Sequence, residues 1–567
     1  MRNLSKNSER ERSRDSHFYN RSGSAAPGTI QDSHRDCCKN DNGSHSLCSE
    51  FLLKFLSYIM PLCLFLSYHP VMKLGESESM YFELSVAEVW LVAFDIVGMV
   101  EMARRKKLFA GLSGKWWVWV LVPVWLALSV AWSLNTTRGA LTAGLMWAIV
   151  TAGYVMWGLR DVWDEGFRRR WWKWFFGSTL VVCGWCVVQC VLDLVGVPQE
   201  CTLMCDGCTY RMFGFPHPNG FAIEPQFMGN LLLAPMMVSA YLYLAKKHAS
   251  KNDNGSHSLC SKVLLACFFA ITFTIFLTFS RGAIYAGVVG MMVVSGVEVA
   301  RYKKKGRGVM WKRVGVVWLA VVGAFVVALV TQGVMAEVSP TSDTFGDGVA
   351  KVVEHLSLGV IKTRGEKEAR RDGPESGNGE VVENLEGGEA QNEEVAVENT
   401  EVDDDGQDAG AEGTIQDTEV EGNKQEAVFD GYVAESTDTR VRLSGAAFEV
   451  WRQDFKTAMV GVGLGGAGQA LYNNGLSPAP REIVQNEYVS LLLETGVVGV
   501  VLCIIVIAMA VRVMWRSSAR VMLVGLVVAY GVSLLFFSGL PNALQVYLMP
   551  VVLMVACGGM TGIYRKV

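Results

Sequence analysis

Four arginines are the residues of this sequence best suited to bind a phosphate or pyrophosphate group: Arg211, Arg281, Arg440 and Arg442. A guanidinium carries paired N–H donors in a fixed plane, and these donors match the oxygens of a phosphate. Arg281 stands in the motif Thr278-Phe-Ser-Arg-Gly282, a turn between two apolar runs that is too short to leave a membrane surface. The alternative is an interfacial arginine whose charge reaches toward lipid headgroups.

Arg211 begins an irregular segment, Arg211-Met-Phe-Gly-Phe-Pro-His-Pro-Asn219, which continues through Glu224-Pro-Gln226 into an apolar run. Non-helical backbone near membrane depth usually lines a cavity, so this segment is expected to contribute to a site. Three cysteines precede it, at Cys201, Cys205 and Cys208. In an oxidising compartment they favour one disulfide with one thiol left over, rather than a zinc site.

The composition indicates how these residues are positioned, because it argues against a soluble enzyme. Hydrophobic residues make up 51% of 567, charged residues only 19%, and mean hydropathy is +0.26. We expect an all-α polytopic membrane protein, since about a dozen apolar runs are each long enough to cross a bilayer. The twelve predicted spans are 51–72, 81–102, 116–134, 139–158, 174–196, 227–245, 263–279, 282–300, 314–331, 488–511, 519–537 and 542–561.

Lysine and arginine are concentrated in alternate connections between these spans, for example at 104–107 and 303–307. Because cytoplasmic loops of membrane proteins carry the excess of Lys and Arg, both termini are expected in the cytoplasm. Residues 1–50 then form a cytoplasmic polar tail, and 51–331 and 488–561 contain spans one to nine and ten to twelve. The large loop 332–487 lies outside.

Within this outer loop, residues 365–430 carry 22 acidic and 4 basic residues and almost no aromatic ones. Such a segment buries too little apolar surface to offset the cost of ordering, so we expect a disordered insert. Residues 440–458 are expected to form an amphipathic helix, with Leu443, Ala447, Phe448, Trp451 and Phe455 on one face. The glycine run at 461–466 follows a helix rather than a strand, which argues against a dinucleotide site.

Five features, in this order, resemble the O-antigen ligase and polymerase superfamily of bacterial envelope glycosyltransferases. They are the segment Arg211 to Asn219, the Phe-Ser-Arg-Gly turn, the Arg-to-Trp helix, the Gly-Val-Gly-Leu-Gly run, and Gln485-Asn486 nine residues before Gly496-Val-Val-Gly499. The resemblance covers about residues 51–561, without the polar tail and the acidic insert.

The resemblance implies a C-type glycosyltransferase-like fold. Members of the superfamily move a glycan from an undecaprenyl-diphosphate carrier to an acceptor hydroxyl, on the outer side of the bacterial plasma (inner) membrane. The acceptor is a lipid A core, another lipid-linked glycan or a protein. Neither a metal nor another cofactor is needed, and no nucleic acid takes part.

Carried over to this sequence, the resemblance makes Arg211 and Arg281 candidates for binding the diphosphate, with Arg440 or Arg442 completing the clamp. Gln485, Asn486 and Glu487 are the candidate catalytic residues.

Gln485 stands where the ligases typically have His, and a glutamine positions a hydroxyl but takes no proton at neutral pH. Either no strong base is needed, or Glu487, His217 or His355 supplies one.

A multi-span transporter or flippase of lipid-linked sugars is the competing interpretation. Transporters commonly show two related halves and charged residues at mid-membrane. Here the halves look unrelated, and Asp95 is the main acid deep in a predicted span. Clustered outer arginines therefore favour the transferase. The sequence leaves open whether it is a ligase, a polymerase or a protein glycosyltransferase.

Overall fold

A computed structural model describes most of the chain. The described residues are 43–67, 70–77, 80–109, 117–195, 197, 216–245, 261–301, 307–338, 344–358, 361, 424–480, 482–515, 517, 519–539 and 543–558. Contacts divide the chain into two units, residues 1–48 and residues 49–567. The second unit contains the helical bundle, and every contact given below lies within it.

Each predicted span overlaps one helix of the bundle. The twelve helices are α1 (Gly43–Phe65), α2 (Val86–Arg104), α3 (Trp117–Ser129), α4 (Thr136–Gly158), α5 (Glu165–Leu194), α6 (Pro225–Ala245), α7 (Ser261–Leu277), α8 (Arg281–Arg301), α9 (Arg307–Val338), α14 (Glu487–Trp515), α15 (Arg520–Ser533) and α16 (Leu544–Gly558). Among the described helices, six are long and apolar enough to cross a membrane: α4, α5, α6, α8, α9 and α14. The described part of the chain is thus mostly helical, and the lengths and composition of these helices agree with the predicted membrane protein.

One part of the all-α expectation is wrong. Strands β1 (Val71–Ser77) and β2 (Met80–Ser85) form an antiparallel hairpin, in which Val71 pairs with Ser85 and Ser77 with Met80. The hairpin replaces the end of the predicted span 51–72 and the start of 81–102. Lys73, Glu76 and Glu83 interrupt its apolar residues, and charges at this frequency do not suit a membrane helix.

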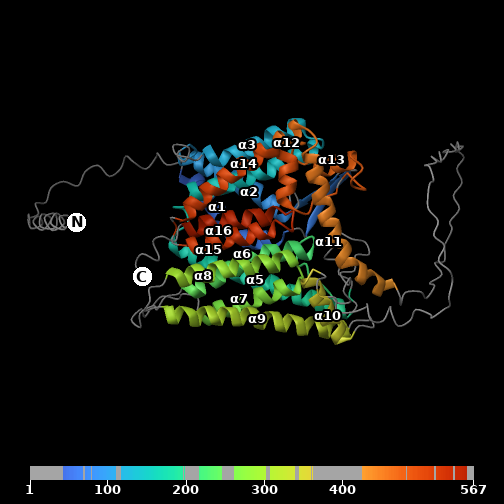
Figure 1. Ribbon diagram of the computed structural model, residues 1–567. Coiled ribbons are helices and arrows are strands. Elements are labelled where there is room, and N and C mark those ends of the chain that lie inside the picture. The colour runs from blue at the N-terminus through green and yellow to red at the C-terminus, as the bar shows by residue number, and fades with distance from the viewer. Residues whose placement is uncertain are drawn as a thin grey trace, which may run out of the picture. The chain divides into compact units, whose positions relative to one another are not determined.

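Helix α6 lies at the centre of the bundle, between α7, α8 and α15 (Figure 1). It is buried on all sides, as expected for a helix without a polar face. Small residues let α8 and α15 approach closely: a Cβ on Gly290 would come within 2.8 Å of the Ala529 Cβ. This close backbone approach is typical of helix pairs in membranes.

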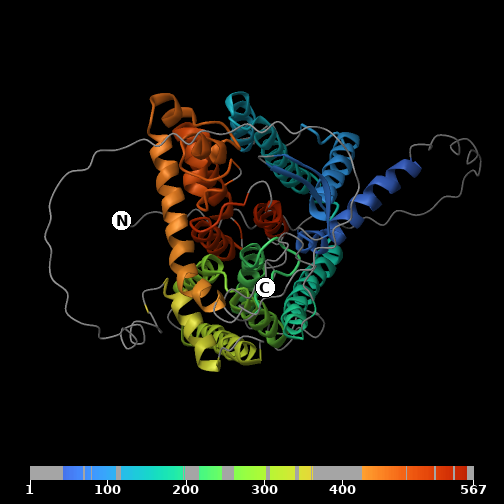
Figure 2. The same cartoon turned by 90° about the vertical axis from the view of Figure 1, so that its right-hand side faces the viewer.

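Four further helices lie at one end of the bundle, at the right of Figure 1: α10 (Phe345–Leu356), α11 (Lys424–Trp451), α12 (Phe455–Val460) and α13 (Ala467–Asn473). Figure 2 shows α11 running across this end, which we call the loop end. The predicted helix 440–458 overlaps both α11 and α12, but α11 begins earlier than predicted, at 424, inside the predicted disordered insert. Residues 365–423 lie outside the described part.

The predicted apolar face of this helix is also partly wrong. Leu443, Ala447 and Val450 are buried, but Phe448 is 44% exposed and Phe455 is 81% exposed. The helix breaks after Trp451, and Asp454 caps the separate helix α12 by accepting from the backbone N–H of Thr457 at 2.8 Å. The break rotates Phe455 away from the face that packs on the bundle.

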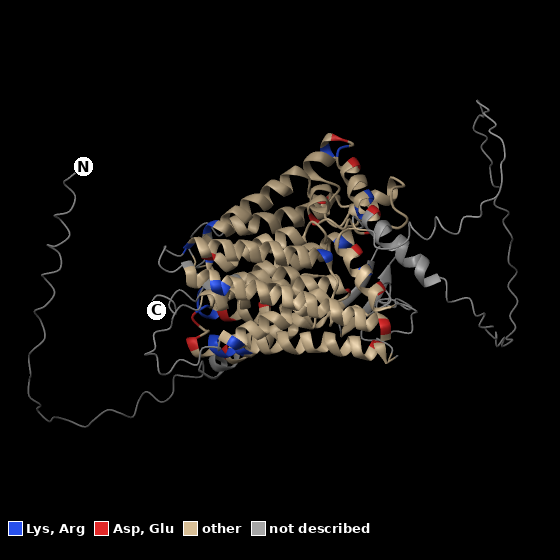
Figure 3. Ribbon diagram, turned by 60° about the horizontal axis from the view of Figure 1, so that its bottom comes forward, with Lys and Arg blue, Asp and Glu red and all other residues tan. Residues whose placement is uncertain are grey.

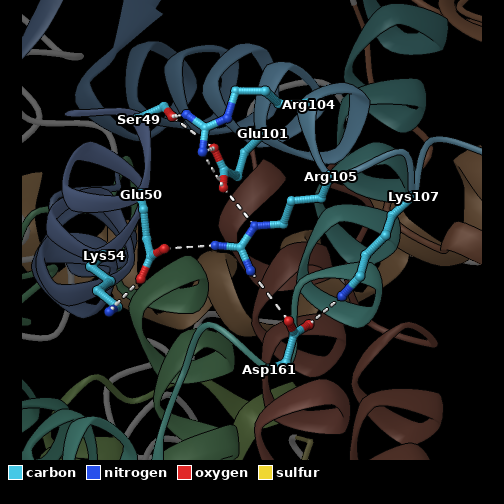
Figure 4. Close-up of polar contacts among 8 residues, drawn as sticks. All are labelled: Ser49, Glu50, Lys54, Glu101, Arg104, Arg105, Lys107 and Asp161. Carbon is cyan, nitrogen blue, oxygen red and sulfur yellow. Dashed lines mark hydrogen bonds and ion pairs between the residues drawn. The ribbon is translucent and has the colours of Figure 1, made fainter. Parts of the chain in front are cut away.

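Most of the described lysines and arginines of the bundle lie at its opposite end, which we call the basic end (Figure 3). An ion-pair network there joins α1, α2 and the connection between α4 and α5 (Figure 4). Arg105 is its centre and reaches Glu101 at 2.6 Å, Glu50 at 2.7 Å and Asp161 at 3.2 Å. Glu101 is fully buried, so its carboxylate depends on the ion pair with Arg105.

Replacing Arg105 with Met is expected to lower the free energy of unfolding by about 3 kcal/mol, since removing one partner leaves a buried carboxylate undercompensated. The matched control is Arg169→Met, which removes an exposed pair with Glu165 and should cost less than about 1 kcal/mol. Thermal unfolding of both variants in detergent measures the difference. Equal midpoints for the two variants would contradict a structural role for Arg105.

Candidate functional site

Two of the four candidate arginines come together at the loop end of the bundle. Arg281 is the first residue of α8 and only 6% exposed, and Arg440 lies on α11. The positive charges of both act on His355 of α10. Ser280 holds the start of α8, because its carbonyl oxygen accepts from Ile284 N–H at 2.9 Å. Residues far apart in sequence thus form one basic cluster, the arginine cluster.

An aromatic stack supports this cluster. Phe279 lies between two histidine rings, with ring centroids 5.1 Å from His217 and 4.3 Å from His355. His355 Nε2–H donates to the carbonyl oxygen of Phe279 at 3.1 Å. Phe279 has a positive φ of 57°, uncommon for a large side chain, so the packing fixes a strained turn directly before Arg281.

Both histidines are held neutral. Burial lowers the pKa of His217 to about 3. Burial, followed by the charges of Arg281, His217 and Arg440, lowers the pKa of His355. A base with so low a pKa takes up a proton poorly at neutral pH, which argues against His217 or His355 as a general base.

The pKa of His217 makes stability depend on pH. Its unfolded pKa is about 6.5, so above that pH it is neutral in both states and costs no stability. As pH drops from 6.5 toward the folded pKa of about 3, only the unfolded state takes up the proton, and the free energy of unfolding falls by about 1.4 kcal/mol per pH unit. His217→Phe should therefore flatten the loss of stability between pH 6.5 and 4.5, measured as thermal unfolding midpoints. Parallel curves for the wild type and the variant would contradict this.

The irregular segment before α6 completes the arginine cluster. Arg440 Nη2 donates to Gln226 Oε1 at 3.5 Å, and Gln226 Nε2 donates to the carbonyl oxygen of Phe536. The charge of Arg440 also acts on Glu224, which ends the irregular segment. Gln189 fixes the segment from α5, donating to Asn219 Oδ1 at 3.1 Å. The segment is non-helical and largely buried from residue 216 to 224, in line with the sequence prediction.

The predicted catalytic residues take three different positions at the start of α14. Gln485 is exposed. Asn486 caps the helix, since its Oδ1 accepts from the backbone N–H groups of Tyr488 at 3.1 Å and Val489 at 3.2 Å. Glu487 lies close to Ser538, Tyr547 and the N–H of Gly539, and its Oε2 is shielded from solvent without a hydrogen-bond partner among the described residues. Of the three, only Glu487 has an unsatisfied buried oxygen.

Two residues beside Glu487 were not predicted as site residues. The charge of Arg138, on α4, acts on Glu487 and also on Glu494, two residues before the kink of α14 at Gly496. Glu494 Oε1 accepts from the backbone N–H of Ala467 at 3.4 Å. We call Arg138, Glu487 and Glu494 the carboxylate cluster. The one available signal was Arg138 itself, a cation in a short outer connection.

Glycines bring these elements together. Gly461 and Gly496 both have positive φ, 75° and 64°, with extended ψ. A Cβ on Gly461 would come within 2.3 Å of the Glu494 carbonyl oxygen, and one on Gly496 within 2.3 Å of Met459. The glycine run 461–466 therefore packs its bare backbone against the kink of α14. This packing accounts for the glycines without a bound nucleotide.

A single connection touches both clusters. The Leu534 carbonyl oxygen, after α15, accepts from Glu487 N–H at 3.0 Å, while the Phe536 carbonyl oxygen accepts from Gln226. Phe536 also contacts α8, where a Cβ on Gly282 would lie 3.0 Å from the Phe536 Cβ. The arginine and carboxylate clusters thus border the same short segment, residues 534–539.

The other predicted residues lie apart from these clusters or outside the described part. Arg442 is on α11 but its side chain is exposed. Arg211, Cys201, Cys205 and Cys208 lie outside the described residues. Among the residues that the structure describes, no group of His, Cys, Asp or Glu could hold a metal ion, and the metal-free reaction stays a prediction. No protein-family model and no curated protein matches this chain.

Proposed function

We propose that this chain is a membrane glycosyltransferase that moves a glycan from an undecaprenyl-diphosphate carrier to an acceptor hydroxyl. The observation that carries the proposal is the arginine cluster, in which Arg281 from α8 and Arg440 from α11 both lie near enough to His355 for their charges to lower its pKa. A pair of largely desolvated guanidinium groups at the end of an apolar bundle suits a lipid-linked diphosphate.

In the proposed reaction, the bond between the sugar's anomeric carbon and the diphosphate oxygen breaks as the acceptor oxygen bonds to that carbon. Negative charge develops on the departing diphosphate, and fixed donors aimed at it stabilise the transition state. Arg281 and Arg440 have this role. The acceptor's proton goes to the Glu487 carboxylate, and the exposed Gln485 positions the acceptor.

The proposed topology has twelve spans, both termini in the cytoplasm and the loop 332–487 on the outer side of a bacterial plasma membrane. The separation of the basic end from the loop end supports this orientation (Figure 3). The carrier's diphosphate then meets the arginine cluster at the outer surface, where its glycan is displayed.

The test uses the purified full chain in nanodiscs with undecaprenyl-diphosphate oligosaccharide, with and without a lipid A core acceptor. Products are resolved by gel and mass spectrometry. A ladder of lengthening lipid-linked chains without added acceptor identifies a polymerase, and a product formed only with the core identifies a ligase. No transfer in either case, together with movement of the lipid-linked sugar between leaflets, would overturn the proposal in favour of a flippase.

Two variants separate positioning from proton transfer. Gln485→His is expected to retain transfer activity, because the side chain is exposed and a hydroxyl-positioning group is kept. Glu487→Gln is expected to lower kcat by about 10²–10⁴-fold, the usual contribution of a general base. Single-turnover rates in the nanodisc assay measure both. Unchanged rates in Glu487→Gln would show that Glu487 is not the general base. The reaction would then depend on departure of the diphosphate without a strong base.

A further inference from the structure

A second site lies at the basic end, far from the chemistry proposed above. An apolar cavity of about 50 Å³ opens there between α1, α5 and α16. Its lining includes Met60, Met156, Phe167 and Trp171, together with the arginines Arg160 and Arg168. The volume is far below the roughly 300–1,000 Å³ of pockets that enclose a drug-sized molecule, so most of any ligand would remain in the surrounding bilayer.

The walls of the cavity leave few polar groups unsatisfied. Trp163 Nε1–H donates to Ser57 Oγ at 3.1 Å, and Trp171 Nε1–H donates to the Ser57 carbonyl oxygen at 2.9 Å. Ser57 Oγ itself donates to the Leu53 carbonyl oxygen at 2.7 Å. Because these indole and hydroxyl groups already have hydrogen-bond partners within the protein, the interior of the cavity is suited to a hydrocarbon chain.

The two arginines give the cavity mouth an excess of positive charge. Arg168 Nε is buried and has no hydrogen-bond partner among the described residues. Arg160 lies over the Trp157 ring, 4.9 Å from its centroid. Two acids of the connection before α5 have other partners: Asp161 pairs with Arg105 and Lys107 (Figure 4), and Asp164 accepts from Phe167 N–H at 2.7 Å to cap α5.

We infer that this cavity binds an anionic phospholipid, with its phosphate between Arg160 and Arg168 and part of one acyl chain against Met60 and Phe167. Guanidinium groups match phosphate oxygens through paired donors, and basic pockets between membrane helices suit anionic headgroups. The inference does not rest on the proposed glycosyl transfer. It requires only that the basic end meets the headgroup region of a bilayer.

Native mass spectrometry of the full chain in detergent tests the inference by titration with phosphatidylglycerol, phosphatidylcholine and inorganic phosphate. The wild type is expected to bind phosphatidylglycerol more tightly than phosphatidylcholine and to bind inorganic phosphate weakly. The double variant R160Q/R168Q should lose about 30-fold in phosphatidylglycerol affinity, at roughly 1 kcal/mol for each arginine. Arg169→Gln is the control, since Arg169 is on the same turn but pairs with Glu165.

Equal affinity of the wild type and the double variant for phosphatidylglycerol would overturn the inference. Equal affinity of the wild type for the two lipids would do the same, because it would show a purely apolar contact. Tight binding of inorganic phosphate would also overturn the inference, because it would show that the site binds a free anion and not a lipid. A second variant, Ala556→Leu, narrows the cavity without changing its charge and should weaken phosphatidylglycerol binding. This variant keeps the inference testable if the double variant does not fold.

Discussion

Arg281→Ala is expected to lower glycan transfer by about 10²–10³-fold, the usual effect of removing one preorganised donor from a site where negative charge develops. Arg281 is 6% exposed, so bulk water cannot readily replace its guanidinium donors in the variant. Arg281→Lys should recover only part of the activity, because an ammonium lacks the paired planar donors. The measurement is single-turnover transfer in nanodiscs, with the carrier in excess.

Arg452→Ala is the matched control for this substitution. Arg452 also lies at the loop end, just after α11, but it is exposed and pairs with Glu449 at 2.8 Å. Its removal should leave the transfer rate unchanged within about 2-fold, as expected for an exposed ion pair. Full activity of Arg281→Ala in a correctly folded protein would end its assignment to the diphosphate.

Gly461→Ala and Gly496→Ala are each expected to cost about 3 kcal/mol or more of folding stability. Both positions combine φ near +70° with ψ near 180°, a region essentially limited to glycine, where strain alone costs about 1–3 kcal/mol. A Cβ would also come within 2.3 Å of backbone atoms, which move only with their helices. We expect low yields of folded protein and early thermal unfolding.

Gly445→Ala provides the comparison. Gly445 lies on α11, and a Cβ there would meet nothing within 4 Å. Because Ala is the better helix former by about 1 kcal/mol, this variant should be as stable as the wild type or slightly more stable. Thermal unfolding in detergent distinguishes the three variants. Similar midpoints for Gly461→Ala and Gly445→Ala would show that the glycine run tolerates side chains and does not fix the kink.

The helices were predictable from sequence because hydrocarbon imposes one strong rule, that a crossing segment is long, apolar and helical. The rule does not govern the ends of the helices. Residues 71–85 form a hairpin and α11 begins at 424, and in both places polar residues are free to follow local preferences. The face of α11 was misjudged at Phe455 because the Asp454 cap interrupts the helical period, and a short cap is a weak signal.

The candidate site was predictable in its residue types but not in its grouping. Arg281 was recognisable from its turn, since a cation between two apolar runs is rare. Nothing in the sequence places Arg440 rather than Arg442 near His355, because that choice depends on the rotation of α11 on the bundle. In the sequence, Glu494 looks like any residue of an apolar helix. It becomes a candidate site residue only because the structure brings the charge of Arg138 and the backbone N–H of Ala467 to it.

A hydrogen bond to the glycine run can form only late in synthesis of the chain. Ser133 Oγ, in the first third of the chain, donates to the Leu464 carbonyl oxygen at 2.7 Å across 331 residues. Ribosomes add roughly 5–20 residues per second, so Ser133 waits about 15 to 70 seconds for this partner to be made. During that interval the junction of α3 and α4 lacks this contact. Slowed translation between residues 133 and 464 would lengthen this interval.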